Sequence, residues 1–278
     1  HLFGTPAVSS TAIINGNMTE KSKKQKISKS KTTSWGGVAH WYDTLLAGDD
    51  TYQARVILPN ILRAMAIKNG ERVLDLACGQ GFFTRAFFQD GADATGVDIG
   101  KQLILIAKKE SPKEIKYFPH TAEDLSLFED KSFDKIAIVL AIQNIEAPHK
   151  VFKECARVLA PGGKLFIVLN HPAFRIPKAS AWGFDEEAKT QYRRIDSYMS
   201  ESKVEIEMNP SKHDTKTTIT FHRPLQYYFK TLANNGFVVA RLEEWLSHRE
   251  SESGPRKKAE DKARKEIPMF LFFEARKN

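Results

Sequence analysis

Short apolar runs alternate with amphipathic stretches between residues 71 and 171. The runs are rich in Val, Ile, Leu and Phe, as is typical of strands that are buried on both faces. Between them, apolar residues recur every three or four positions, as on one face of a helix. The pattern predicts strands in 71–78, 92–100, 115–125, 132–145 and 164–171, and helices in 82–90, 101–110 and 148–160. Strands and helices that alternate in this way predict a doubly wound α/β fold with a parallel sheet.

The two ends of the chain extend this pattern. Apolar residues at helical spacing in 39–67 predict one or two N-terminal helices, and 223–237 predicts another helix. Two further strands are expected in 237–245 and 268–277. The charged run between them, 248–266, has no helical pattern and is expected to be a solvated loop, so the last strand is antiparallel. We therefore expect a seven-stranded sheet that is parallel except for its last strand.

An insertion follows the fifth strand and interrupts the alternation. Residues 185–200 predict a helix, and two alternating runs, 203–208 and 216–221, are expected to pair as a hairpin. We expect this insertion to form a cap over a substrate site. The predicted organisation is a disordered basic tail (1–33), N-terminal helices and core (34–170), the cap (171–222) and the end of the core (223–278).

Composition narrows the class of protein. The chain has 278 residues and a net charge of +8, but a lysine-rich tail whose composition offers little apolar surface to bury carries much of that charge. Cys78 and Cys155 are too few for a disulfide framework, which favours a reducing, cytoplasmic setting. No apolar run approaches the ~20 residues that span a bilayer. No Cys/His cluster has metal-ligand spacing, so no metal is expected.

The stretch VLDLACGQGFF, residues 73–83, joins the first strand to a helix through a glycine turn. Gly79 and Gly81 match only part of a dinucleotide-binding pattern, whose third glycine is replaced by Thr84. The carboxylate of Asp75 would repel a pyrophosphate, whereas it would attract a cationic ligand. S-adenosylmethionine carries an ammonium group and a sulfonium and has no phosphate. Asp98, at the end of the second strand, is placed to accept hydrogen bonds from a ribose diol.

Four successive motifs, VLDLACGQG, GVDIG, TAEDLSLFEDKSFD and FKECARVLAPGGKLFIV, resemble those of class I S-adenosylmethionine-dependent methyltransferases. The resemblance is closest to the ubiquinone/menaquinone-type (methyltransferase type 11) group. It implies that S-adenosylmethionine is the methyl donor and that S-adenosylhomocysteine is the product. It also implies cofactor contacts at Tyr42, Asp75, Ala77, Gly79, Gly81, Asp98, Ile99, Thr121, Ala122, Glu123, Leu140 and Gln143.

These implied contacts divide by the part of the cofactor they touch. Asp75 and the glycines face the methionine part, Asp98 faces the ribose, and residues 121–123 flank the adenine. Leu140 and Gln143 line the methionine side, and Tyr42 closes over the cofactor. The family often has Asp where this chain has Thr121, so the adenine amino group needs another acceptor, such as Glu123.

Asn170 and His171 end the fifth strand on the cofactor side of the sheet and are the candidate catalytic pair. His171 would act as a general base and Asn170 as an orienting partner. The alternative is that Pro172 only ends the strand and His171 fills a polar gap. Candidate substrate contacts in and beside the cap are Arg175, Tyr192, Arg193, Arg194, Tyr198 and His222.

Three functions are compatible with these motifs. The first is a methyltransferase acting on an oxygen or nitrogen nucleophile of a small molecule. The second is an RNA or protein methyltransferase that uses the lysine-rich tail as an electrostatic arm. The third is a cofactor-binding protein without catalysis, which the intact glycine loop, Asp75 and Asp98 argue against.

Overall fold

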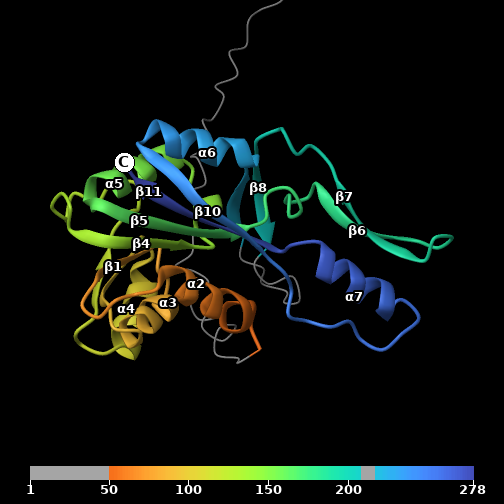
Figure 1. Cartoon of the computed structure of the whole chain (residues 1–278), viewed down its shortest axis with the longest axis horizontal. Coiled ribbons are helices and arrows are strands. Elements are labelled where there is room, and N and C mark those ends of the chain that lie inside the picture. Colours follow the sequence, from red (N-terminus) through yellow and green to blue (C-terminus); the bar gives the residue numbers. More distant parts are fainter. Residues whose placement is uncertain (1–49, 208–216) are drawn as a thin grey trace, which may run out of the picture. The chain divides into compact units, whose positions relative to one another are not determined.

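The computed structural model describes residues 50–207 and 217–278, so the basic tail and Tyr42 lie outside the described residues. Its centre is a seven-stranded sheet with strand order β10-β11-β5-β4-β1-β2-β3 (Figure 1). The strands of this sheet are β1 (Arg72–Leu76), β2 (Asp93–Asp98), β3 (Lys116–Pro119), β4 (Phe133–Val139), β5 (Leu159–Asn170), β10 (Phe237–Trp245) and β11 (Phe270–Lys277). The five strands expected between residues 71 and 171 are all present.

The last strand runs against its neighbours, as expected. β11 pairs antiparallel with both β5 and β10, whereas the β1–β2, β1–β4, β2–β3 and β4–β5 pairs are parallel. The prediction of a doubly wound sheet, parallel except for its last strand, is therefore confirmed. The carboxyl ends of β1, β2, β4 and β5 consequently share one edge of the sheet, where ligands bind in open α/β folds.

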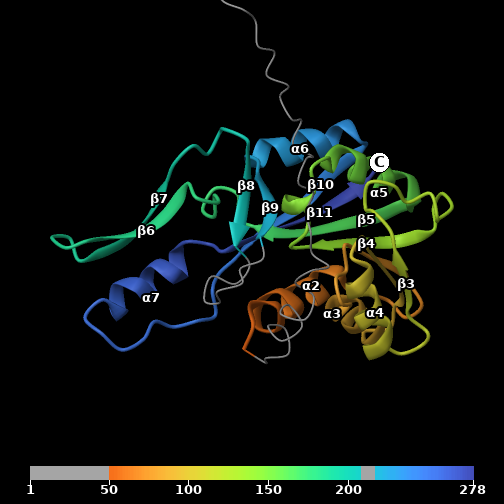
Figure 2. The same ribbon diagram turned by 180° about the vertical axis from the view of Figure 1, so that it is seen from behind.

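Helices cover both faces of the sheet, with α2, α3 and α4 on one face and α5 and α6 on the other (Figures 1 and 2). They are η2 (Gln53–Ile57), α2 (Leu58–Met65), α3 (Phe82–Gln89), α4 (Lys101–Glu110), η3 (Ile142–Asn144), α5 (Pro148–Val158) and α6 (Leu225–Asn234). Along β5, the side chains alternate between the two helical layers: Phe166 and Val168 join one core, and Leu165 and Ile167 join the other. This burial on both faces explains why the strands are almost continuously apolar.

The insertion contains two hairpins, one of which the sequence predicted. β8 (Ser202–Glu207) pairs antiparallel with β9 (Thr217–His222), as expected. The helix expected over 185–200 is wrong, because residues 185–195 belong to a hairpin of β6 (Ser180–Asp185) and β7 (Thr190–Ile195), and no helix follows in 196–200. Helix-forming residues near 186–189 make the turn, and cross-strand pairs such as Trp182 with Arg193 determine the conformation instead.

The charged run before β11 also differs from expectation. Residues 257–266 form helix α7 (Lys257–Glu266) rather than a solvated loop. Its one buried residue is Ala263, and the helix packs against β7. In Figures 1 and 2, β6, β7 and α7 lie together beyond the carboxyl end of β5. We call these three elements the lobe; it combines the insertion after β5 with the connection between β10 and β11.

Candidate functional site

The loop between β1 and α3 turns sharply at the shared edge of the sheet. Ala77, Gly79 and Gly81 have positive φ angles of 63°, 57° and 80°. A left-handed backbone conformation is strained for any residue that has a Cβ. The loop nevertheless adopts this conformation at Ala77 as well as at the two glycines. Its connection to the sheet is firm, because the Cys78 amide donates to the Val97 carbonyl at 3.0 Å.

Gly81 is required by packing inside the protein. A Cβ at this position would lie 2.3 Å from the hydroxyl oxygen of Tyr117 on β3. Tyr117 also fills the space beside Gly96 on β2, where a Cβ would lie 2.5 Å from its ring. The sequence suggested that Gly81 leaves room for a ligand. The structure adds a second reason for a glycine here, because a side chain would collide with Tyr117.

Asp75 is a buried carboxylate, only 1% exposed, on β1 directly before the loop. Its Oδ2 accepts a hydrogen bond of 2.6 Å from the Thr84 hydroxyl on α3. Burial raises the pKa of Asp75 to about 7, and the nearby charge of Asp98 adds to this effect. No cationic side chain of the described residues counteracts this rise, so the carboxylate lacks a neutralising partner.

Asp98 ends β2 and is held by backbone amides. Its Oδ2 accepts from the Gly79 amide at 2.9 Å, and its Oδ1 accepts from the Gly100 amide at 2.7 Å. Each oxygen retains a second lone pair for a further donor. Burial raises the pKa of Asp98, while the two amide hydrogen bonds oppose the rise. The adjacent Ile99 is 65% exposed, which leaves an apolar surface beside this carboxylate.

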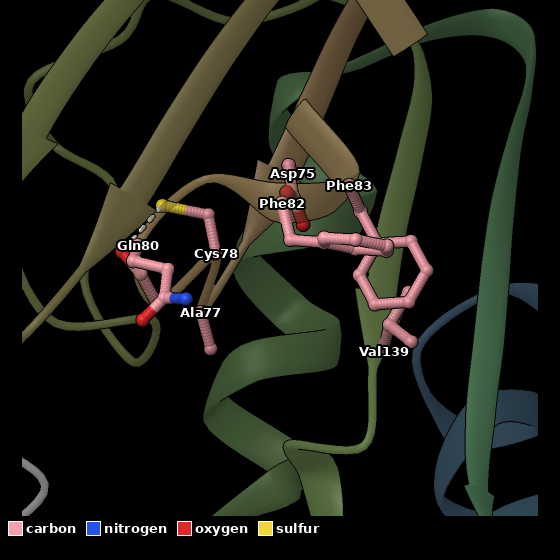
Figure 3. Close-up of a pocket in the computed structure, with 8 residues that line it drawn as sticks. Asp75, Ala77, Cys78, Gln80, Phe82, Phe83 and Val139 are labelled. Carbon is pink, nitrogen blue, oxygen red and sulfur yellow. Dashed lines mark hydrogen bonds between the residues drawn. The ribbon is translucent and has the colours of Figure 1, made fainter. Parts of the chain in front are cut away.

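A cavity of about 40 Å³ lies beside the loop, lined by Asp75, Ala77, Cys78, Gly79, Gln80, Phe82, Phe83 and Val139. Figure 3 shows Phe83 next to Val139, with Cys78 and Gln80 on the other side of the cavity. Gln80 is 3% exposed, and its Oε1 is buried without a hydrogen-bond donor among the described residues. The cavity is therefore lined by a carboxylate without a cationic partner, Asp75, and by Gln80, whose Oε1 accepts no hydrogen bond within the described residues.

The residues expected near the methionine part and the adenine lie at the same edge. Leu140, after β4, has a positive φ of 54°, and its carbonyl accepts from the Gln143 side-chain amide at 2.9 Å. The Gln143 Oε1 is buried without a partner within the described ranges. Beyond β3, the Thr121 Oγ1 accepts from the Glu123 amide at 3.3 Å, and Ala122 packs against the core. The Glu123 carboxylate accepts from the Ala147 amide, which begins α5.

His171 is 4% exposed, and both nitrogens of its imidazole are engaged within the protein. Its Nδ1 accepts from the Ala173 amide at 3.2 Å, so the proton is on Nε2, which donates to Glu244 Oε1 at 2.7 Å. Burial lowers the pKa of His171 despite the opposing effect of Glu244. A neutral imidazole with both nitrogens occupied has no free lone pair for a substrate proton. Glu244, on β10, had no signal in the sequence that linked it to His171.

Asn170 and the expected substrate residues do not converge on one point. Asn170 is exposed at the end of β5. Tyr192 is 47% exposed on β7, and the Arg194 guanidinium donates to Asp196 at 2.9 Å on the outer side of the hairpin. Tyr198 and His222 instead contact each other: His222 Nε2 donates to the Tyr198 carbonyl at 2.7 Å. The Tyr198 hydroxyl accepts from the Leu225 amide at the start of α6.

Arg193, on β7, contacts the segment after β5 that carries Arg175. Arg193 Nε donates to the Phe174 carbonyl at 2.9 Å, which brings β7 against the segment that follows β5. The lobe contributes one more arginine to this region, Arg264 on α7, whose charge acts on Arg175. The sequence reading missed Arg264 because it placed this residue in a solvated loop.

Neither a metal site nor a membrane span is found in the described part of the chain. Residues 50–207 and 217–278 contain no group of three or more His, Cys, Asp or Glu side chains that could hold a metal ion. Over the same ranges, no helix combines the length and apolar character that crossing a bilayer requires.

Comparison with known proteins agrees with the fold and the loop. Residues 74–167 match the family Methyltransf_11, described as a methyltransferase domain. The ubiquinone biosynthesis O-methyltransferase of Xanthomonas oryzae pv. oryzae is 34% identical over 101 residues, which are 35% of this chain and 42% of that protein. The protein of the same name from Xanthomonas campestris pv. campestris is 32% identical over 121 residues, 42% of this chain and 46% of that one. The chain thus spans less than half the length of these curated relatives.

A solved structure extends the likeness beyond the matched segment. An S-adenosylmethionine-dependent methyltransferase from Mesorhizobium loti superposes with a TM-score of 0.63 and 26% identity, over 82% of this chain and 99% of that one. The family match, the seven-stranded sheet with its antiparallel last strand and the glycine loop beside Asp75 and Asp98 all agree. Residues 74–167 therefore form a methyltransferase domain of the class I, S-adenosylmethionine-dependent family.

Proposed function

We propose that this protein transfers the methyl group of S-adenosylmethionine to an oxygen or nitrogen atom of a small molecule. One observation carries the cofactor assignment within this chain. Asp75 is a buried carboxylate at the cavity beside the loop, and no cation among the described residues neutralises it. A ligand ammonium group placed there would remove the cost of burying that charge. The unpaired Oε1 of Gln80 at the same cavity supports a ligand that donates hydrogen bonds.

The other cofactor contacts are part of the same proposal. Asp98 is held rigidly by two amides and keeps one lone pair on each oxygen, which suits the two hydroxyls of a ribose. Exposed Ile99 would pack on the adjoining ring system. Thr121, Ala122 and Glu123 would flank the adenine, and the Thr121 hydroxyl proton is free to reorient. Leu140 and Gln143 would line the methionine side.

S-adenosylmethionine supplies a methyl group on a positively charged sulfur, which is already an excellent leaving group. The chain therefore needs to align the acceptor and exclude water, and alignment contributes up to about 7–11 kcal/mol in favourable cases. Because both nitrogens of His171 are occupied, they favour the alternative to catalysis, in which His171 has a structural role. We infer that His171 positions the segment after β5 through Glu244 and does not remove a proton from the acceptor. Asn170, exposed at the end of the strand, remains the candidate to orient the acceptor.

Binding and turnover test this function separately. Calorimetry should detect S-adenosylmethionine and S-adenosylhomocysteine, and NAD should give no signal. Asp75→Asn preserves the size of the side chain and an acceptor for Thr84 but removes the charge, so it should bind far more weakly. Incubation with radiolabelled S-adenosylmethionine and a panel of phenols, carboxylic acids and amines should then label a small molecule. Labelling only of RNA or protein would refute the small-molecule assignment, and cofactor binding without any labelling would refute catalysis.

A further inference from the structure

Three arginines from separate elements gather where the lobe meets the core. Arg175 follows β5, Arg193 lies on β7 and Arg264 lies on α7. Hydrogen bonds fix two of them: Arg193 donates to Ser180 Oγ at 2.8 Å as well as to the Phe174 carbonyl, and Arg264 Nε donates to Ser251 Oγ at 3.2 Å. All three side chains are half-buried. We call Arg175, Arg193 and Arg264 the arginine cluster.

None of the three arginines forms an ion pair with a carboxylate among the described residues; the Asp261 carboxylate, which binds the Ser251 amide near Arg264, is paired with Lys257 instead. Elsewhere in the protein, arginines of similar exposure are paired, as Arg157 is with Glu154 at 2.8 Å. The guanidinium of Arg175 makes no hydrogen bond and no ion pair within residues 50–207 and 217–278. Burial lowers the pKa of Arg175, and the charges of Arg193 and Arg264 lower it further. Because arginine stays protonated in proteins, the chain holds repelling cations at this place.

The position of the cluster relates it to methyl transfer. β1, β4 and β5 are consecutive neighbours in the sheet and are parallel, so their carboxyl ends share one edge. Neighbouring strands are about 4.8 Å apart, which places the end of β5 about 10 Å from the loop after β1. Arg175 lies five residues beyond the end of β5 at Asn170. The segment that carries Arg175 therefore begins at the sheet edge that also holds the loop after β1.

Resting on the proposed function, we propose that the arginine cluster binds an anionic group, a carboxylate or a phosphate, of the methyl acceptor. Guanidinium groups suit both anions because their N–H donors match the paired oxygens of each. Arg175 is the side chain that makes the contact, since its donors are free. Arg193 and Arg264 are held in place by the lobe and strengthen the positive potential at this point. The bound anion takes the place of the missing counter-charge.

Arg175→Gln tests the site without disturbing the fold. The substitution removes a charge that makes no bond in the described structure, so the unliganded variant should be at least as stable as the wild type. Arg194→Gln is the matched control, because Arg194 is the neighbour of Arg193 on β7 but pairs with Asp196 away from the cluster. The two variants have the same net charge, so a non-specific effect of charge would be the same in both.

Inorganic phosphate and acetate serve as probes, titrated at constant ionic strength with chloride as the balancing anion. At least one of them should raise the melting temperature of the wild type and of Arg194→Gln by saturable binding, and Arg175→Gln should bind it about tenfold more weakly or not at all. The stronger of the two probes identifies a phosphate- or a carboxylate-bearing acceptor. Equal responses of the two variants, or no response of the wild type to either probe, would overturn the proposal.

Methyl transfer distinguishes failure of this inference from failure of the proposed function. A hydroxylated aromatic acid and its neutral amide are compared as acceptors, with S-adenosylhomocysteine affinity measured on the same samples. The wild type and Arg194→Gln should prefer the acid by about tenfold in kcat/KM, and Arg175→Gln should lose the preference while its cofactor affinity is unchanged. If the amide is methylated as well as the acid, the anionic acceptor is refuted and the methyltransferase stands. If S-adenosylhomocysteine does not bind, the proposed function is refuted, and with it the acceptor role of the cluster.

Discussion

The affinity for S-adenosylhomocysteine is expected to depend on pH through Asp75. Burial raises the pKa of this carboxyl to about 7 in the ligand-free protein. Only the ionised form can pair with the ammonium group of the ligand, and that pairing would lower the pKa of Asp75 in the complex. Binding therefore requires loss of a proton below about pH 7.

The magnitude follows from the fraction of Asp75 that is ionised. At about pH 5, two units below the pKa, about one protein molecule in a hundred carries the charge. The dissociation constant should thus rise by nearly tenfold per pH unit well below pH 7, and by about fiftyfold between pH 7, where about half of Asp75 is ionised, and pH 5. Above about pH 7 the affinity should level off while the ligand amino group remains protonated.

Isothermal titration calorimetry measures both the affinity and the number of protons released on binding. At about pH 6, repeating the titration in buffers of different ionisation enthalpy should reveal release of nearly one proton per ligand bound. The pKa of Asp98 is also raised, so the Asp75→Asn variant assigns the effect: its affinity should be low and nearly independent of pH. A wild-type affinity that stays constant between about pH 5 and pH 7, without proton release, would refute the contact between Asp75 and the ammonium group.

The same titration has a consequence for the ligand-free fold, and other residues offer further tests. Because the pKa of Asp75 is raised from 3.8 to about 7 on folding, its contribution to stability is present below pH 3.8 and is lost as the pH rises to 7. Asp75→Asn should therefore stabilise the ligand-free protein at about pH 8, by up to about 4 kcal/mol in urea unfolding; an unchanged or lower stability would contradict the burial argument. Asp98→Ala should weaken S-adenosylhomocysteine binding by at least about ten- to a hundredfold, because loss of even one charge-assisted hydrogen bond costs about 1.5–3 kcal/mol; an unchanged dissociation constant would place the ribose elsewhere. His171→Gln and Glu244→Gln should both lower the free energy of unfolding and should change turnover to a similar extent. If only His171→Gln lowers turnover, and raising the pH relieves that loss, His171 acts as a general base after all. Deletion of residues 1–33 should leave S-adenosylhomocysteine affinity unchanged, because this composition has little to bury, and a collapse of affinity would show that the segment contributes to the cofactor site.

The core of the fold was readable from local pattern. Between residues 71 and 171, each strand is a buried apolar run, and each helix has apolar residues every three or four positions. Both patterns can be recognised from residues that are close together in the sequence. The helix α4 was predicted with its observed limits, 101–110. The glycine loop, Asp75 and Asp98 were also readable, because a strand that ends in a carboxylate beside glycines is itself a local signal.

The lobe was not readable, because long-range contacts determine its structure. Residues 185–200 contain good helix formers, yet pairing of β7 with β6 satisfies their backbone and overrides propensity. Helix α7 has almost no apolar face and buries only Ala263, so its sequence resembles a solvated loop. Its contact with β7 is what stabilises it.

Sequence by itself determined the class of the fold, the cofactor loop and the chemical type of its two carboxylates. Tertiary structure alone decided which polar groups meet. It turned Arg193 toward the Phe174 carbonyl and Arg194 toward Asp196, because successive side chains of a strand point to opposite faces. It joined His171 to Glu244 across a separation of 73 residues, and it added Arg264 to the arginines near β5. Such meetings depend on the packing of distant segments, which no local period in the sequence encodes.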